Sequence, residues 1–267
     1  MKPLFIFLIG VFIGITACNQ QDNSIRVNVK NPLNIECNDI VIEITDSKIL
    51  DQILMLNNFT VTDKQQALPF HVINNNGSIK KLLVLCSFSE GESKDLLINK
   101  TEFPVNFKSR TQAEISVKEG GVWVWVTKSN GNEQFEYQGG TWKNVTEFEV
   151  PEQHTDHSFD IRYEGPGWES DKIGYRFYLD WRNAVDIFGK KVDTMVLQNV
   201  GLDGFDSYHE MSDWGVDVLK VGNSLGLGSI GHWENNKALR VETTEKLFSA
   251  VDYSGVLESK ITTTYTN

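Results

Sequence analysis

The residues best suited to chemistry lie in the run "KIGYRFYLDWR", residues 172–182. Apolar side chains alternate there with polar ones, which predicts one β-strand with its apolar face in a core. Its other face carries Arg176, Tyr178, Asp180 and Arg182 at every second position, about 7 Å apart. Guanidinium groups bind carboxylate or sulfate in pairs of hydrogen bonds, so this face predicts a site for an anionic ligand. The alternative is a surface ladder of salt bridges without a ligand.

The loop "DSYHEMSDWG" is the second candidate, because Tyr208 and His209 are adjacent and carboxylates surround them. A phenol and an imidazole can give and take a proton, and nearby carboxylates raise the pKa of a histidine. We assign the acid and base roles to this pair, with Tyr178 or Lys220 as substitutes. A polar loop with a solvated histidine is the alternative. A glycoside hydrolase would instead use two carboxylates from the set Asp180, Asp206, Glu210 and Asp213.

Aromatic and histidine residues elsewhere are weaker candidates. Trp123 and Trp125 share one face of the predicted strand "GGVWVWVTK" and could stack on a sugar, or both faces of that strand could be packed. His154 and His157 precede a strand, which favours a surface loop with a structural His157 over a metal site. We predict no cofactor, with a divalent metal not excluded.

The elements that must position these residues are strands. Residues 26–108 contain short alternating runs separated by turn signals, which predict a small N-terminal β-sandwich. One helix is predicted, in "SKILDQILMLNN". Residues 109–267 predict a larger antiparallel β-sandwich that carries the candidate site, so the fold class is all-β. The strand-like ending "LESKITTTYTN" leads us to expect that this sandwich is incomplete at the C-terminus.

The beginning of the chain predicts export. Residues 1–17 have the basic start, apolar run and small residues of a secretory signal, and Cys18 follows as in a lipoprotein signal. Residues 18–25 would then form a polar tether, with the protein anchored in the cell envelope, at the outer membrane or in the periplasm, by acyl chains on Cys18. A cleavage site without lipidation is the alternative.

Charge and cysteine content add two expectations. The net charge of −11 disfavours nucleic acid as a partner, although local basic clusters can still receive anionic sugars. In an oxidising compartment Cys37 and Cys86 could form a disulfide, but two buried thiols are the preferred interpretation.

Residues 154–191 and 201–229 together resemble an uncharacterised domain family of Bacteroidota. The quoted motifs are "HTDHSFDIRYEGPGWESDKIGYRFYLDWRNAVDIFGKK" and "GLDGFDSYHEMSDWGVDVLKVGNSLGLGS", and the likeness extends from about Ile25 to the last residue. Its members are encoded among polysaccharide-degradation genes and extend further at the C-terminus. The resemblance implies an exported carbohydrate-active lipoprotein of β-sandwich build. Some relatives are associated with dehydration of a terminal uronic acid on algal oligosaccharides.

Dehydration of a uronate sets three chemical tasks. The substrate carboxylate must be neutralised, a base must remove the proton on the carbon next to it, and an acid must protonate the departing hydroxyl. Arg176 or Arg182 suits the first task, and Tyr208 and His209 suit the others. We therefore expect a lyase or dehydratase acting on acidic oligosaccharides. A glycan-binding lipoprotein that uses Trp123, Trp125 and the arginine-bearing face, and the hydrolase above, are the competing hypotheses.

Overall fold

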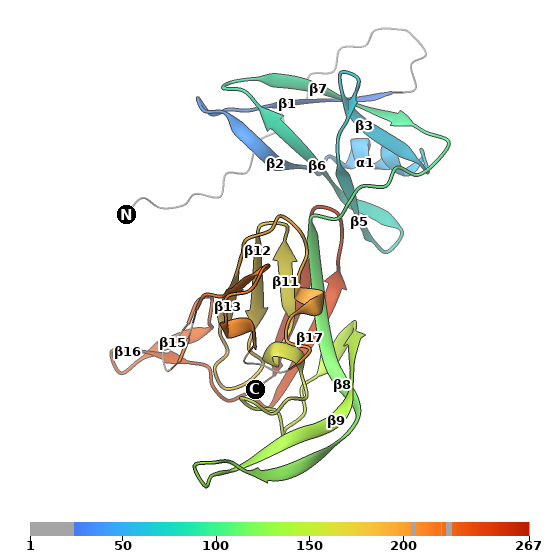
Figure 1. Ribbon diagram of the computed structural model, residues 1–267. Helices are drawn as coiled ribbons and strands as arrows, with labels where there is room; N and C mark the ends of the chain where they lie inside the picture. The colour runs from blue at the N-terminus through green and yellow to red at the C-terminus, as the bar shows by residue number, and fades with distance from the viewer. Residues whose placement is uncertain (1–23, 204–206, 220, 223–225, 267) are drawn as a thin grey trace. The chain divides into compact units, whose positions relative to one another are not determined.

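The computed structural model describes residues 24–203, 207–219, 221–222 and 226–266 (Figure 1). The predicted lipidation site Cys18 and the candidate Lys220 lie outside the described residues, as does Asp206. The chain divides into two compact units, Met1–Ser109 and Arg110–Asn267, and each is described by itself.

Over residues 24–109, the described part of the N-terminal unit, the chain forms two antiparallel sheets and one helix. The first sheet has the order β1-β7-β3-β4, with β1 Ile25–Lys30, β3 Phe59–Asp63, β4 Gln66–Ala67 and β7 Ser93–Lys100. The second has the order β2-β6-β5, with β2 Cys37–Ile44, β5 Phe70–Asn75 and β6 Ser78–Phe88. Apolar residues of both sheets share one core, among them Val27, Val61 and Leu82. This arrangement is the predicted small sandwich.

Two local predictions can be checked in this unit. The expected helix is present as α1, Ser47–Leu54, and the Asp46 side chain caps it by accepting a hydrogen bond from the Ile49 N–H at 3.0 Å. Cys86 is buried as expected and Cys37 is half-buried; both thiols are free, so the possible disulfide is absent.

The C-terminal unit is built around a six-stranded antiparallel sheet with the order β14-β13-β12-β11-β8-β9. Its strands are β8 Thr111–Thr127, β9 Glu133–Val145, β11 Gly167–Ser170, β12 Ile173–Phe177, β13 Val185–Lys190 and β14 Gly215–Asp217. A three-stranded sheet follows, with β10 Glu147–Glu149, β17 Lys246–Tyr253 and β18 Lys260–Thr266. β15 Gly231–Glu234 and β16 Lys237–Arg240 form a separate hairpin, and three 3₁₀ turns, Arg162–Glu164, Leu197–Asn199 and Ser207–His209, complete the unit.

The six-stranded sheet is packed on both faces. On one face, Ile115 and Val117 of β8 meet Leu247 of β17 in an apolar core between the two sheets. On the other face, Phe188 of β13 packs against Tyr163 and Tyr208, which come from the turns covering the sheet. The candidate site lies on this second face.

The prediction of one strand over residues 172–182 is wrong in two respects. β12 ends at Phe177, and the chain then turns, since the Asn183 N–H donates to the Asp180 carbonyl at 3.0 Å and the Tyr178 N–H to the Ala184 carbonyl at 2.9 Å. The face expected to be open is also the more buried one, because Arg176 is 1% exposed whereas its neighbour Tyr175 is only half-buried. Internal acids and aromatic rings compensate the charge of Arg176, which alternation of residue types does not reveal.

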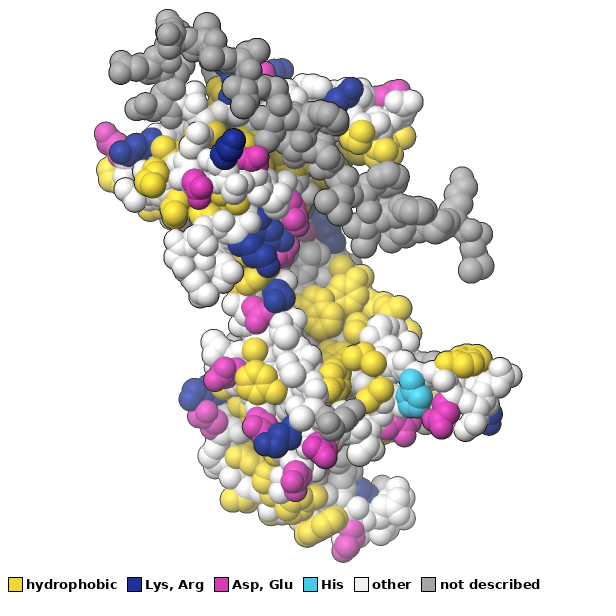
Figure 2. Space-filling view, turned by 180° about the vertical axis from the view of Figure 1, so that it is seen from behind, with side chains coloured by type: hydrophobic (Ala, Val, Ile, Leu, Met, Phe, Trp, Pro, Cys, Tyr) yellow, Lys and Arg dark blue, Asp and Glu magenta, His cyan; other side chains and the backbone are white. Residues whose placement is uncertain are grey.

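The all-β fold class is confirmed by this arrangement. Within the described part of the chain, no helix has the length and apolar character needed to cross a bilayer. Hydrophobic side chains gather on the rear face of the C-terminal unit, which Figure 2 shows in space-filling form.

Candidate functional site

Two buried arginines organise the candidate site on the second face of the six-stranded sheet. We call the arginine cluster the set formed by Arg176 and Arg182 with the ring and acid side chains that surround them. Its members besides the arginines are Asp156, His157, Glu164, Tyr178, Asp180, Asp186, Tyr208, His209 and Asp217.

Arg176 is held by groups from two neighbouring strands, from one turn and from the segment that follows β12. Its Nη2 donates to Asp186 on β13 and to Asp217 on β14, each at 2.8 Å, and also to the Tyr178 hydroxyl. Its Nη1 donates to the Tyr208 hydroxyl at 2.6 Å, and its guanidinium group lies 4.9 Å from the centre of the Tyr208 ring. The guanidinium group therefore fixes both phenols and two acids but is closed to a ligand.

Arg182 occupies the outer part of the arginine cluster. Its Nη2 donates to Glu164 at 2.9 Å and also to Asp180, and its Nη1 lies 3.1 Å from Asp156. The guanidinium group stacks 3.7 Å from the centre of the Tyr178 ring. The Arg182 side chain retains 11% exposure, so of the two arginines it is the one that can meet a ligand.

Glu164 joins the two arginines, since its other carboxylate oxygen lies 3.6 Å from Arg176 Nη1. The local backbone explains how it arrives there: Tyr163 and Glu164 have φ values of 39° and 67°, in the left-handed region that residues with a Cβ seldom adopt. The chain also needs glycine at Gly167 opposite Arg176, because a Cβ there would lie 2.4 Å from the Tyr163 hydroxyl. Such strain is more common at functional sites than elsewhere.

Negative charge exceeds positive charge in the arginine cluster, where five carboxylates face two guanidinium groups. Burial, with the nearby charge of Asp186, raises the pKa of Asp217 to about 7, although Arg176 opposes that shift. Burial likewise raises the pKa of Glu164 and holds the pKa of Tyr208 well above its ordinary value. Asp217 can therefore change protonation state near neutral pH.

His209 is the member of the Tyr-His pair that reaches the surface. Its side chain is 29% exposed, and its Nδ1 lies 3.5 Å from the Asp217 carboxylate. The ring is 4.7 Å from the Tyr208 ring, measured between centroids. An exposed imidazole with a buried carboxylate behind it is a common arrangement for accepting a proton.

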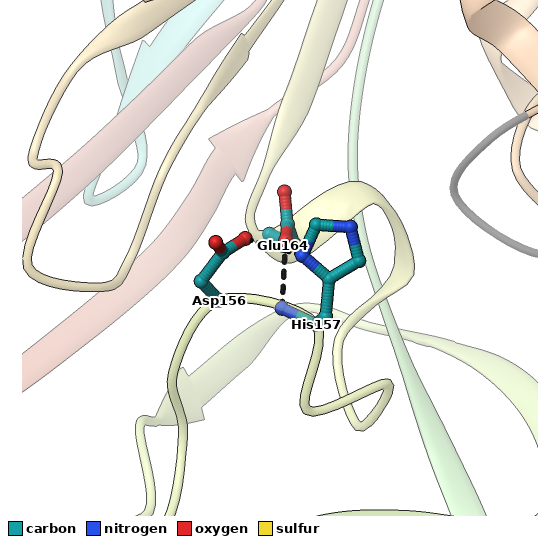
Figure 3. Close-up of side chains that lie close together, drawn as sticks. All are labelled: Asp156, His157 and Glu164. Carbon is teal, nitrogen blue, oxygen red and sulfur yellow. Dashed lines mark hydrogen bonds and ion pairs between the residues drawn. The ribbon is translucent and has the colours of Figure 1, made fainter. Parts of the chain in front are cut away.

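Asp156, His157 and Glu164 lie in the part of the arginine cluster around Arg182, and one ligand atom of each lies within 4.8 Å of the others (Figure 3). Asp156 Oδ1 is 2.6 Å from His157 Nδ1, and Glu164 accepts from the His157 N–H at 3.0 Å. These donor types suit a divalent cation. Arg182 already binds both carboxylates, however, so a cation would have to displace a guanidinium group.

His154 does not lie on the surface as expected. Its side chain has 0% exposure, and its Nδ1 lies 2.8 Å from the Asp160 carboxylate. Burial lowers its pKa, but the hydrogen bond with Asp160 and the charges of Asp160, Asp180 and Glu164 together outweigh burial, so the pKa is raised. His154 is therefore a structural residue behind the arginine cluster, whereas His157 is the one that is partly exposed.

The predicted tryptophan pair lies on the β8–β9 hairpin and not in the arginine cluster. Trp123 stacks on Phe135 with 5.3 Å between ring centres, and the next ring in the row, Trp125, is 68% exposed. The alternative in which both faces of this strand are packed is wrong. The same hairpin touches the site, because the Gln134 side chain donates to the Asp156 carbonyl at 2.7 Å.

The structure thus brings together Arg176, Tyr178, Tyr208, His209 and, through Glu164, Arg182 with its partner Asp180. It adds Asp186, Asp217 and Glu164, which sequence reasoning missed. Asp186 occupies a polar position in the alternating pattern of β13, and that was a signal in the sequence. Recognising it as a partner of Arg176 requires the strand register, Arg176↔Asp186, which the sequence does not show. Of the described carboxylates that the hydrolase hypothesis would use, Asp180 is paired with Arg182, and Glu210 and Asp213 are exposed.

A comparison with protein-family models finds one match, described as a domain of unknown function (DUF4861), over residues 29–267. No curated protein and no solved structure matches the chain.

Proposed function

The chain belongs to the DUF4861 family, and from that membership and the arginine cluster we propose that its C-terminal unit is an enzyme that eliminates water from the terminal uronic acid of acidic oligosaccharides. The observation that carries the proposal is the pairing of half-exposed His209 with Asp217, whose pKa is raised to about 7. Strongly shifted acids beside an accessible base are typical of proton-transfer sites.

His209 is the base in this proposal. It removes the proton on the carbon next to the substrate carboxylate, and the Asp217 carboxylate stabilises the resulting imidazolium across 3.5 Å. The electron pair of the broken C–H bond forms the new C=C bond, and the neighbouring hydroxyl leaves with one proton as water. Because the imidazolium can return its proton to that hydroxyl, atoms and charge balance without a co-reactant.

Arg182 is the cation that receives the substrate carboxylate, since its guanidinium group is the less buried of the two. A uronate would exchange with Asp156 at Nη1, because Asp156 is the half-exposed partner of Arg182. Arg176 is a positioning residue, which fixes Tyr208 and Asp217 beside His209. The high pKa of the Tyr208 phenol keeps it protonated, so its role is to hold a hydrogen bond and not to act as the base.

The proposed site of action is the cell envelope. It rests on the export signal at residues 1–17 and on Cys18 as the lipidated residue, with the acyl chains as the membrane contact. An acidic oligosaccharide is the proposed partner there, and the net charge of −11 argues against nucleic acid. Labelling of cells with a radioactive fatty acid tests the anchor, which Cys18→Ala removes.

The elimination is tested by incubating the protein with uronate-terminated oligosaccharides. We expect loss of one water by mass spectrometry and near-ultraviolet absorbance from the new double bond. His209→Ala should lower kcat by about 10²-fold or more. His232→Ala is the matched control, because His232 is an exposed histidine on β15 that pairs with Glu234. Oligosaccharides that bind the wild-type protein but never lose water contradict the proposal.

A glycan-binding role without catalysis is the second candidate, and the exposed indole of Trp125 favours it. Trp125→Ala would then abolish binding of neutral and acidic oligosaccharides alike, whereas the elimination proposal expects Trp125→Ala to bind normally and His209→Ala to bind without removing water. A binding titration on these two variants separates the hypotheses.

A further inference from the structure

Two surface clefts in the described part of the C-terminal unit, apart from the arginine cluster, have linings that differ in chemistry. The aromatic cleft, about 410 Å³, is lined by Trp168, Phe177 and Tyr265 with Ser259, Lys260 and Thr263 at its polar side. The acidic cleft, about 430 Å³, is lined by Glu152, Asp180, Glu242 and Glu245 with Lys246. Tyr265 lines both, so the clefts adjoin.

Volume and lining of the aromatic cleft suit a small polar molecule with an apolar face. Its size lies in the range of small-molecule sites, about 300–1,000 Å³. Trp168 is fixed from behind by stacking on Tyr175, with 5.5 Å between ring centres and 17° between planes. A sugar ring has one face of C–H groups for such a ring and an edge of hydroxyls for Ser259 and Thr263.

Charge distinguishes the two clefts as sites for an acidic sugar. Within the described lining of the aromatic cleft, Lys260 is the only ionisable residue apart from the phenol of Tyr265. In the acidic cleft, four carboxylates stand against one ammonium group. A uronate-containing chain is therefore attracted to the first cleft and repelled by the second.

We propose that the aromatic cleft is a separate binding subsite for sugar units of acidic oligosaccharides, with Trp168 as the stacking ring and Lys260 as the charge contact. The inference rests on the proposed function for its ligand class only. The cleft lies on the opposite face of β12 from Arg176, since Phe177 lines it and adjacent strand residues point to opposite faces. Binding at this subsite can therefore be measured apart from the chemistry.

The test is a calorimetric titration of the full chain with a uronate-terminated tetrasaccharide, carried out in the His209→Ala background so that the sugar is not consumed. Trp168→Ala should weaken binding about tenfold, while Trp168→Phe retains most of the affinity because a stacking ring remains. Trp233→Ala is the matched control: Trp233 is 71% exposed on β15 and does not line the aromatic cleft.

Lys260→Gln provides a second variant that leaves the fold intact, since its side chain is 54% exposed and pairs with Asp252 at the surface. It should weaken binding of the acidic tetrasaccharide several-fold and leave a neutral tetrasaccharide unaffected. If Trp168→Ala and Lys260→Gln bind the acidic tetrasaccharide with the same affinity as the His209→Ala parent, the proposed subsite is wrong. A dimer in light scattering that Trp168→Ala dissociates also overturns it, because a second copy then occupies the cleft. Normal binding without elimination in the wild-type protein contradicts only the proposed function.

Discussion

The interiors of the two units differ in kind. Among the described residues of the N-terminal unit, Asn31 is the single polar residue that is buried. The two sheets of this unit share an apolar core. Of the residues that the structure describes in the C-terminal unit, eleven charged ones are buried, which are Glu114, Glu136, Asp160, Arg162, Glu164, Glu169, Arg176, Asp180, Arg182, Asp186 and Asp217. Buried ion pairs seldom stabilise a fold more than apolar side chains of the same size would. The comparison indicates that apolar packing dominates one interior and buried charge the other, and the proposed function assigns chemistry to that charge.

The largest effect should come from removing the central cation. Arg176→Met leaves Asp186 and Asp217 buried without a cation, which should lower the free energy of unfolding of the C-terminal unit by about 3–5 kcal/mol. All seven tryptophans lie after residue 109, so fluorescence in a urea titration follows this unit alone. The control Arg26→Met removes an exposed arginine from the N-terminal unit, and an equal effect of both variants would contradict the comparison.

An apolar truncation should act on the other unit. Leu82 is fully buried in the N-terminal core, so Leu82→Ala should cost about 2–5 kcal/mol through lost contacts and the cavity left behind. Circular dichroism should show an earlier transition while tryptophan fluorescence keeps its midpoint. If both signals shift together, the two units unfold in one cooperative transition, and their different interiors do not give them separate stabilities.

Stability of the two units should depend differently on pH. Burial raises the folded-state pKa of Asp217 to about 7, so the folded state binds more protons than the unfolded state between about pH 4 and 7. Stability from this group is complete below pH 4 and is lost as the pH rises through 7. The raised pKa values of His154 and His157 add a loss in the same direction above about pH 6.5.

The N-terminal unit should be insensitive in that window, because the raised pKa values found there, about 11 for Cys86 and above the ordinary value for Lys94, act at higher pH. Urea midpoints from fluorescence should fall between pH 5 and 8, and Asp217→Asn should flatten the fall. A fluorescence midpoint independent of pH would show that Asp217 is ionised throughout.

The smallest effect is expected from divalent cations. Arg182 already binds the Asp156 and Glu164 carboxylates, so millimolar Mn²⁺ or a chelator should leave the melting temperature and the rate of water loss unchanged. Arg182→Gln vacates that position and should create weak Mn²⁺ binding, detectable by electron paramagnetic resonance. Tight Mn²⁺ binding to the wild-type chain would identify a metal centre in place of the ion network.

Sequence patterns predicted the strands of the N-terminal unit well. Runs such as residues 80–88 carry apolar residues in the alternating or continuous pattern that is typical of buried sandwich strands. In the C-terminal unit the same rule failed at Arg176, since alternation shows which residues share a face but not which face is buried. The Tyr208–His209 pair was singled out because the two residues are adjacent and carboxylates stand beside them in the sequence. Asp186 and Asp217 were missed because their contacts with Arg176 depend on strand register and on β14, Gly215–Asp217, which is too short to be recognised from a pattern.

The central claim is that His209, supported by Asp217, removes a proton from the carbon next to a uronate carboxylate. Proton exchange in D₂O tests this step directly, with the signal of that C–H group followed by nuclear magnetic resonance while the oligosaccharide is incubated with the protein. The wild-type protein should deplete the signal through exchange or water loss, His232→Ala should do the same, and His209→Ala should leave the signal intact. A wild-type protein that binds the oligosaccharide and leaves that C–H signal unchanged would contradict the account.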